Sequence, residues 1–378
     1  MRIAIVQGTR PEIVKNYSLV RALSAAKVPF EVFHTGQHSA RRMCGDIYDE
    51  MGYRPDRRLT SPYRLGAAIN WLQVTFKKDR VSHVVVNGDT AAALAGAIAA
   101  LYCDIPVSHV EAGLRARDRF MIEERNRIAV DAIASLLFAY TEHESRLLSQ
   151  SPDLRGRVFV EGNTTIDVLH DFKERIEGVA REQSPYVFVT MHRKEFTDSS
   201  ERIRTVFSTL AEIARRTCRV VFPMHPRTRD AMRRHRIPLR LLGDVCVQPP
   251  CPVLESLALQ SQAAAVITDS GCVQEEAYML GVPCITIREN TERHLTVFYR
   301  ANVVTGFDTA RISEAVEEAL VKDHVRWPEI YGRPGVGDRI IDQIVKSTPR
   351  RGISEVEREV SRISANVTEF SLVARAAT

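Results

Sequence analysis

Short apolar runs that each end in a group of polar residues recur along this chain of 378 residues. The first run, 2–6, reads as a buried strand and leads into 8–12 (GTRPE), where proline favours the start of a helix. Apolar residues at helical spacing follow over 13–23. Strands that alternate with helices predict a parallel sheet covered by helices on both faces.

The alternation runs through the chain twice. Between the two runs, the stretch 177–185 is polar and lacks periodicity, and a chain of this length is expected to form two domains. We therefore predict an N-terminal domain over 1–170 and a C-terminal domain over 171–378, with a tail helix from Ile353 that packs back on the body. Strands are expected at 30–33, 81–86, 105–110, 137–140, 158–160, 187–190, 220–223, 245–247, 264–268 and 284–287, and helices at 91–101 and 200–216.

Composition narrows the possible functions. The net charge of +5 is small for this length and the basic residues are scattered, so no nucleic-acid partner is expected. No apolar run reaches the roughly 18 residues that span a bilayer, so no membrane partner is expected either. The seven cysteines are widely spaced without a C-x-x-C, which disfavours a zinc site or a disulfide framework and favours a cytoplasmic location.

Acidic residues follow successive predicted strands of the first half. They are Asp89, Glu111 and Glu123. Carboxylates that crowd into one cleft shift one another's pKa, which suits proton transfer, although each acid taken alone could be structural. Arg10 and Lys15 follow the first strand and are candidates to bind a diphosphate. The alternative for these two cations is a helix that begins at proline and carries surface charges.

Histidines end two successive strands of the second half. His192 is followed by Arg193, and His225 ends the next strand. A histidine beside a nucleotide can steady a leaving phosphate or carry a proton, whereas a lone histidine at a strand end is usually structural.

The segment 268–276 (TDSGCVQEE) ends a strand in small residues and opens a helix. Backbone N–H groups at Ser270 and Gly271 are candidates for phosphate binding, and Glu276 lies within reach of a ribose. The alternative is an ordinary helix cap. The P-loop, G-x-G-x-x-G and G-x-S-x-G signatures are all missing from the sequence, and no His/Cys/Asp set has metal-ligand spacing. We therefore expect no metal and no cofactor.

These motifs, in this order, resemble the non-hydrolysing UDP-N-acetylglucosamine 2-epimerases. Each motif is weak alone, but the ordered set is specific and extends over most of the chain. The matching segments are 8–12 (GTRPE) with Lys15, 35–38 (TGQH), 88–90 (GDT), 109–115 (HVEAGLR), 123–127 (EERNR), 162–164 (GNT), 192–195 (HRKE), 268–276 (TDSGCVQEE) and 291–293 (TER).

The resemblance implies two Rossmann-like, doubly wound domains that face each other across a cleft, the GT-B fold. It implies interconversion of UDP-GlcNAc and UDP-ManNAc, with the UDP-sugar and UDP as the ligands and UDP held mainly by the second domain. In such an enzyme the C2 proton is removed and UDP leaves from C1, which gives a 2-acetamidoglucal. UDP then adds back while C2 is protonated on the opposite face. Dimers are common in the family, so a homodimer is expected.

The resemblance also implies roles for individual residues. Three carboxylates act on C2, in an order that remains open, and His192 assists the departing UDP; the catalytic set is thus Asp89, Glu111, Glu123, His192 and Lys15. Arg10, Ser270 and Gly271 hold phosphate and Glu276 the ribose. The substrate-binding set is Arg10, Arg115, Asn163, Arg193, His225, Ser270, Gly271, Cys272, Glu276 and Arg293.

The chain departs from the commonest bacterial pattern at several places. Its loop 115–123 is shorter and looks more like that of archaeal members and of members that act on 2,3-diacetamido uronic sugars. Cys272 stands where the family usually has a second Gly, and the bacterial activator site is matched only at Gln37 and His38. The alternatives are an epimerase of such a modified UDP-sugar, a GT-B glycosyltransferase, a UDP-sugar sensor, and a relative that releases free ManNAc.

Overall fold

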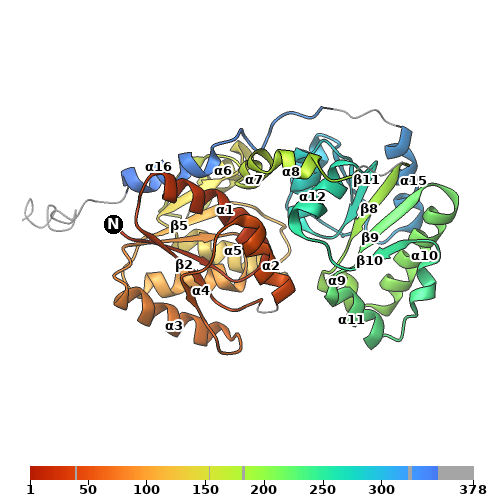
Figure 1. The fold of residues 1–378 in the computed structure, drawn as a ribbon. Coiled ribbons are helices and arrows are strands. Elements are labelled where there is room, and N and C mark those ends of the chain that lie inside the picture. The colour runs from red at the N-terminus through yellow and green to blue at the C-terminus, as the bar shows by residue number, and fades with distance from the viewer. Residues whose placement is uncertain (39–40, 153, 181–183, 322–325, 348–378) are drawn as a thin grey trace, which may run out of the picture.

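The computed structural model describes residues 1–38, 41–152, 154–180, 184–321 and 326–347. These residues form two lobes, and each lobe is a parallel sheet with helices on both faces (Figure 1). The predicted α/β class with two doubly wound halves is therefore confirmed. The tail helix predicted from Ile353 lies outside the described residues.

The first lobe contains a seven-stranded sheet in the order β3-β2-β1-β4-β5-β6-β7. Its strands are β1 (Ile3–Gln7), β2 (Phe30–His34), β3 (Arg57–Arg58), β4 (His83–Asn87), β5 (Val107–Ala112), β6 (Leu136–Ala139) and β7 (Arg157–Val160). The helices of this part of the chain are α1 (Arg10–Ala25), α2 (Arg41–Met51), α3 (Leu65–Lys78), α4 (Ala91–Leu101), α5 (Ile122–Ile133), α6 (Glu142–Ser149), α7 (Thr165–Asp171) and α8 (Lys173–Glu177).

The second lobe contains a six-stranded sheet in the order β10-β9-β8-β11-β12-β13. Its strands are β8 (Tyr186–Thr190), β9 (Arg219–Pro223), β10 (Cys246–Gln248), β11 (Ala265–Thr268), β12 (Cys284–Thr286) and β13 (Asn302–Val304). Its helical elements are α9 (Lys194–Thr197), α10 (Ser200–Arg216), α11 (Pro226–Arg234), the short 3-10 helix η1 (Leu239–Leu242), α12 (Val253–Ser261), α13 (Gly271–Met279), α14 (His294–Phe298) and α15 (Thr309–Val321).

The central strands are buried along their whole length, as parallel strands covered on both faces must be. Every residue of β1, β4 and β5 is buried. Helix α4 packs closely on this sheet because alanines cover its inner face and Gly96 has no side chain: a Cβ there would lie 2.8 Å from Val86. The rigid sheet therefore fixes where the loops at its carboxyl edge begin.

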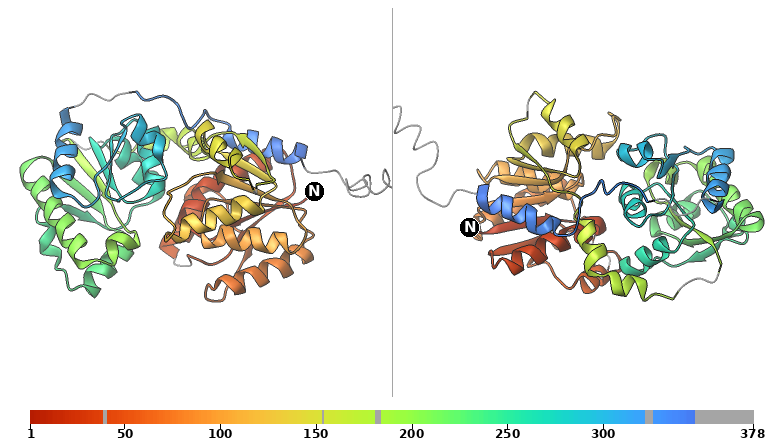
Figure 2. Two further views of the ribbon diagram at one scale, coloured as in Figure 1. Left: turned by 180° about the vertical axis from the view of Figure 1, so that it is seen from behind. Right: turned by 90° about the horizontal axis from the view of Figure 1, so that it is seen from above.

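The described chain ends on the first lobe. Helix α16 (Val336–Ser347) packs against α1, so the last described helix lies beside the first in all views (Figures 1 and 2). Asp167 binds the start of α16 by accepting hydrogen bonds from the backbone N–H groups of Gly335 at 2.6 Å and Gly337 at 2.9 Å. The chain thus crosses between the lobes twice, after α8 and before α16.

None of the helices in the described residues is both long enough and apolar enough to span a membrane.

Candidate active site

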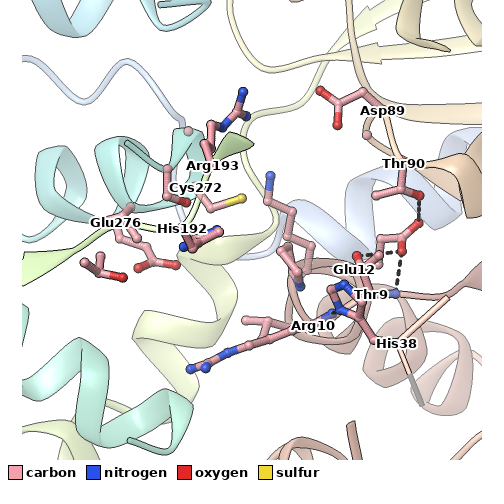
Figure 3. A pocket seen from close by; sticks show the side chains of 18 of the residues that line it. Thr9, Arg10, Glu12, His38, Asp89, Thr90, His192, Arg193, Cys272 and Glu276 are labelled. Atoms are coloured by element: carbon pink, nitrogen blue, oxygen red, sulfur yellow. Dashed lines mark hydrogen bonds between the residues drawn. The ribbon is translucent and has the colours of Figure 1, made fainter. Parts of the chain in front are cut away.

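A cleft of about 390 Å³ lies between the lobes. Loops at the carboxyl ends of β1, β4 and β5 line it from the first lobe, and loops after β8, β9 and β11 line it from the second. Ligands of doubly wound proteins bind at such strand ends. Figure 3 shows Asp89 and Thr90 on one side of the cleft and His192, Cys272 and Glu276 on the other.

Most of the predicted site residues line this cleft. From the first lobe they are Arg10, Lys15, Asp89, Glu111 and Glu123, and from the second His192, Arg193, His225, Ser270, Gly271, Cys272, Glu276 and Arg293. Arg115 and Asn163 do not line it. The Arg115 guanidinium pairs with Asp131 at 2.7 Å, and the Asn163 amide donates to Glu275 at 2.9 Å. Both therefore contact neighbouring protein groups instead of the open cleft.

The backbone of β5 places Glu111 in an unusual conformation. Its φ is +72°, and the pairing of β5 with β6 shifts register between Val110 and Ala112. Such a bulge redirects a side chain, and a left-handed non-glycine residue is costly unless its surroundings hold it. The flanking Gly88 has a φ of +71°, and a Cβ at this residue would lie 3.1 Å from the Glu111 carboxylate. The bulge in β5 and the turn at Gly88 together direct the Glu111 side chain into the cleft.

Two cations hold the Glu111 carboxylate. Lys15 Nζ lies 2.6 Å from Oε2, and Arg293 Nη2 lies 2.7 Å from Oε1. Burial favours the protonated acid, but Lys15 and Arg293 outweigh it and lower the pKa of Glu111 to about 2. Burial also opposes charge on Lys15, yet the carboxylates of Glu111 and Glu275 hold the Lys15 pKa well above its ordinary value. The pair is therefore ionised at neutral pH.

Asp89 and Glu123 both line the cleft, and Asp89 belongs to a second polar group. Asp89 pairs with the buried Arg127, which also pairs with Glu124. Asn126 donates from Nδ2 to the Asp89 backbone oxygen at 2.9 Å. Glu123 is half-buried in the first turn of α5 and lines the cleft. Helix α5 thus presents one carboxylate and positions another.

Two buried acids at the cleft, Glu275 and Glu292, were not predicted as site residues. Glu275 contacts Arg293 Nε at 2.7 Å and Lys15 Nζ at 3.3 Å, and Glu292 contacts Arg293 Nη1 at 2.7 Å. Arg288 pairs with Glu292 at 2.9 Å. The motifs 268–276 and 291–293 contain three of these residues, but only the fold shows that they form one ion-pair cluster. His109 is an internal hydrogen-bond partner: its ring bridges Asp131 at 2.7 Å and the Gly88 carbonyl at 2.9 Å.

The start of α13 offers backbone N–H groups to the cleft. Ser270 is the cap residue, and Gly271 and Cys272 form the first turn. A Cβ on Gly271 would lie 2.7 Å from Glu292 and 3.0 Å from Arg293, so the ion-pair cluster requires glycine here. Burial raises the pKa of the Cys272 thiol to about 12, which keeps it neutral. A helix start with neutral, small neighbours suits a phosphate group.

Two stacked histidines stand beside this helix start. The rings of His192 and His225 lie 4.6 Å apart at 27°. Burial, and then nearby cations that include Arg227 and Arg10, lower the pKa of each histidine to about 3. Among the described residues, the buried His192 Nδ1 has no hydrogen-bond partner. The Asp269 carboxylate accepts from the His192 backbone N–H at 2.8 Å and so fixes this loop. Arg10 and Arg227 therefore place positive charge beside the two rings, which favours the binding of an anion.

Two further acids line the cleft, the buried Glu12 and the half-buried Glu276. Glu276 accepts from Gln260 Nε2 at 2.8 Å, and burial raises the pKa of Glu276 to about 7. Burial also raises the Glu12 pKa to about 7, and this carboxylate accepts hydrogen bonds from Thr9 and Thr90, as Figure 3 shows. Glu12 therefore ties the turn that carries Arg10 to the turn that carries Asp89. Within the described ranges, no three His, Cys, Asp or Glu residues are grouped so that they could hold a metal ion.

Comparison with known proteins places this geometry in a family. The sequence profile of the UDP-N-acetylglucosamine 2-epimerases matches residues 21–345. The UDP-N-acetylglucosamine 2-epimerase of Methanocaldococcus jannaschii is 35% identical over 359 residues, which cover 90% of this chain and 98% of that protein. Its crystal structure in complex with UDP-GlcNAc and UDP gives a TM-score of 0.84 at 33% identity and covers 92% of this chain and 100% of the other.

A relative with a different substrate is nearly as similar. The UDP-2,3-diacetamido-2,3-dideoxy-D-glucuronate 2-epimerase of Pseudomonas aeruginosa is 32% identical over 358 residues, which cover 92% of this chain and 100% of that protein. A spinosyn rhamnosyltransferase shares the two-lobed fold with a TM-score of 0.51 at 13% identity, over 92% of this chain and 96% of that one. That last likeness concerns the fold alone.

Proposed function

Because this chain belongs to the UDP-N-acetylglucosamine 2-epimerase family, we propose that it inverts C2 of a UDP-linked 2-acetamido sugar, in the simplest case UDP-GlcNAc to UDP-ManNAc. The single observation that carries the proposal is the division of one cleft into two halves. Carboxylates stand on the wall formed by the first lobe, and the helix start with its histidines stands on the wall formed by the second.

The wall formed by the second lobe suits the nucleotide. The α13 N–H groups and Arg193 bind the diphosphate together with Arg10, which reaches from the first lobe to the Cys251 carbonyl at 3.4 Å, and Glu276 binds the ribose hydroxyls. Burial and nearby cations keep His192 and His225 neutral, so an arriving or departing diphosphate raises their pKa and favours proton uptake. His192 thereby steadies UDP as the C1–O bond breaks.

The wall formed by the first lobe, here called the acidic wall because it carries Asp89, Glu111 and Glu123, suits chemistry at C2. Asp89 lies in the loop after β4, Glu111 near the end of β5 and Glu123 in the first turn of α5, so carboxylates can approach a sugar ring from different sides. One removes the C2 proton as UDP leaves, which gives the 2-acetamidoglucal. A proton then returns to C2 from the opposite face while UDP adds back to C1. Lys15 holds Glu111 in place through their contact of 2.6 Å.

The likeness to the P. aeruginosa enzyme favours a second candidate substrate of the same reaction class, a UDP-2,3-diacetamido uronic sugar. A panel of both UDP-sugars, followed by ¹H NMR, tests the proposal. We expect one of them to be converted to its C2 epimer without any acceptor. If sugar transfer requires an acceptor and no epimer forms, the chain is a glycosyltransferase and the proposal fails.

Replacement of Glu276 by alanine is expected to weaken UDP binding by roughly 10- to 100-fold, since a charge-assisted hydrogen bond contributes about 1.5–3 kcal/mol. Turnover at saturating substrate should change far less, because Glu276 lies on the nucleotide side of the cleft. Isothermal titration with UDP and steady-state kinetics separate the two effects. Unchanged UDP affinity would remove Glu276 from the ribose site.

The proposal extends to the roles of the two domains, the oligomeric state and the location of the protein. Residues 1–170 form the unit that carries the carboxylates, and 171–378 form the unit that binds UDP, with α16 packed on the former. The protein works as a homodimer in the cytoplasm, without metal or cofactor. Light scattering on the purified chain tests the dimer. The described free cysteines are consistent with a reducing compartment.

A further inference from the structure

Glu275 joins the two lobes behind the cleft. It belongs to α13 in the second lobe, where it immediately precedes Glu276, and its side chain is 1% exposed. From the first lobe, Lys15 Nζ approaches its carboxylate to 3.3 Å and Asn163 Nδ2 donates to it at 2.9 Å. From its own lobe, Arg293 Nε donates at 2.7 Å. The helix that offers its first turn to phosphate is therefore tied directly to Lys15, one of the cations that hold Glu111.

Glu275 and Glu111 share the same two cations. Lys15 lies 2.6 Å from Glu111 and 3.3 Å from Glu275, while Arg293 Nη2 lies 2.7 Å from Glu111 and 2.5 Å from Glu275. Both carboxylates are buried, so water does not screen these contacts strongly. Lys15 and Arg293 thus each contact two carboxylates. If either carboxylate loses its charge, both cations interact with the remaining carboxylate alone.

The wider cluster contains four cations and three carboxylates. Lys15, Arg288 and Arg293 face Glu111, Glu275 and Glu292, and Arg193 lies 3.9 Å from Glu292. A carboxylate that must exchange a proton during turnover can do so only if the cations do not hold it too tightly. Glu275 supplies the competing negative charge.

We propose that Glu275 is a positioning residue, which shares Lys15 and Arg293 with Glu111 and thereby sets how firmly these cations hold Glu111 during epimerisation. The proposal rests on the proposed function and adds to it a residue that touches no substrate. Glu275 acts through the two cations and ties their position to the helix that binds the nucleotide.

The sign of the effect follows from the charges. Removing the Glu275 charge destabilises the protonated forms of its cationic neighbours, so the pKa of Lys15 falls toward its ordinary value. The same change leaves Lys15 and Arg293 to attract the Glu111 carboxylate alone. This attraction stabilises the charged form of Glu111 and makes it a poorer base. The other ionisable groups that face Lys15, Arg293, Glu111 and Glu275 or their neighbours are Arg127, Tyr140, Glu144, Arg193, Cys272, Arg288, Glu292 and Tyr331, and all of them are unchanged in the variant.

The test compares Glu275→Gln with the wild type in the epimerase assay with the UDP-sugar that it turns over, across neutral and alkaline pH. We expect kcat to fall by about tenfold or more, while the Kd for UDP stays close to that of the wild type. The alkaline limb of kcat/KM should move to lower pH, because Lys15 loses its proton earlier. Glu275→Asp, which retains the charge, should restore the alkaline limb.

Asn163→Ala is the matched control, because it removes a tie between Glu275 and the first lobe without changing any charge. We expect its alkaline limb to stay at the position of the wild type. The inference is overturned if Glu275→Gln keeps the kcat and alkaline limb of the wild type, or if Asn163→Ala shifts that limb equally. If instead the wild type epimerises no UDP-sugar, the proposed function itself fails, which is a distinguishable result.

Discussion

Replacing Glu111 by glutamine is expected to lower turnover by about 10³-fold while leaving the affinity for UDP nearly intact. The amide keeps the shape of the side chain but cannot exchange a proton with C2. UDP affinity is expected to survive because the N–H groups of α13 and the stacked histidines belong to the other wall of the cleft. Steady-state epimerisation and UDP titration measure the two quantities separately.

Glu111→Gln also removes one anion from a buried cluster, so its thermal stability must be measured alongside its activity. UDP binding at full stoichiometry shows that the variant is folded. Asp89→Asn is the companion variant, because Asp89 belongs to the separate group around Arg127 and should also lose orders of magnitude in turnover. A variant whose main defect is weak UDP binding would contradict the proton-transfer role of the residue concerned.

Arg293→Ala is expected to lower the free energy of unfolding by about 3–5 kcal/mol. Arg293 is buried and contacts Glu111, Glu275 and Glu292, so its loss leaves three buried carboxylates short of a cation. Burial opposes charge on this guanidinium, but Glu275 and Glu292 outweigh burial and hold the Arg293 pKa well above its ordinary value. Urea titration, followed by circular dichroism, measures the change.

Arg216→Ala provides the comparison. Arg216 pairs with Glu212 at 2.9 Å, but both side chains are more than half exposed. An exposed pair contributes about 0–1 kcal/mol, so this variant should unfold almost as the wild type does. Equal effects of the two substitutions would show that the buried cluster does not hold the lobes as described.

Much of the fold follows from local patterns. Helices predicted over 91–101 and 200–216 have those bounds in the structure, and the predicted strands match the central strands of both sheets within a few residues. Apolar runs flanked by turn residues carry this information. Helix α3 was not predicted, although Ala68, Leu72 and Phe76 are buried at a spacing of four, so its signal was present and overlooked.

The site was predicted as a set of residues but not as a set of contacts. Arg10 and Lys15 were expected to face the same phosphate. Five residues of α-helix, however, separate them by about 140° around its axis, and Lys15 instead meets Glu111. Contacts such as Arg293 with Glu111 join residues from different lobes. No local pattern encodes them, because only the packing of the two sheets brings them together.

The most direct test of the account is epimerisation in D₂O, followed by ¹H NMR at C2 of the sugar. Proton transfer at C2 by the carboxylates predicts that each product molecule carries deuterium at C2. A carboxylate removes the original proton, and the solvent supplies the deuteron that takes its place. Deuterium should also accumulate in recovered substrate as the reaction reverses. A C2 epimer that keeps its original hydrogen would contradict proton transfer by Asp89, Glu111 and Glu123, and with it the roles proposed for the acidic wall.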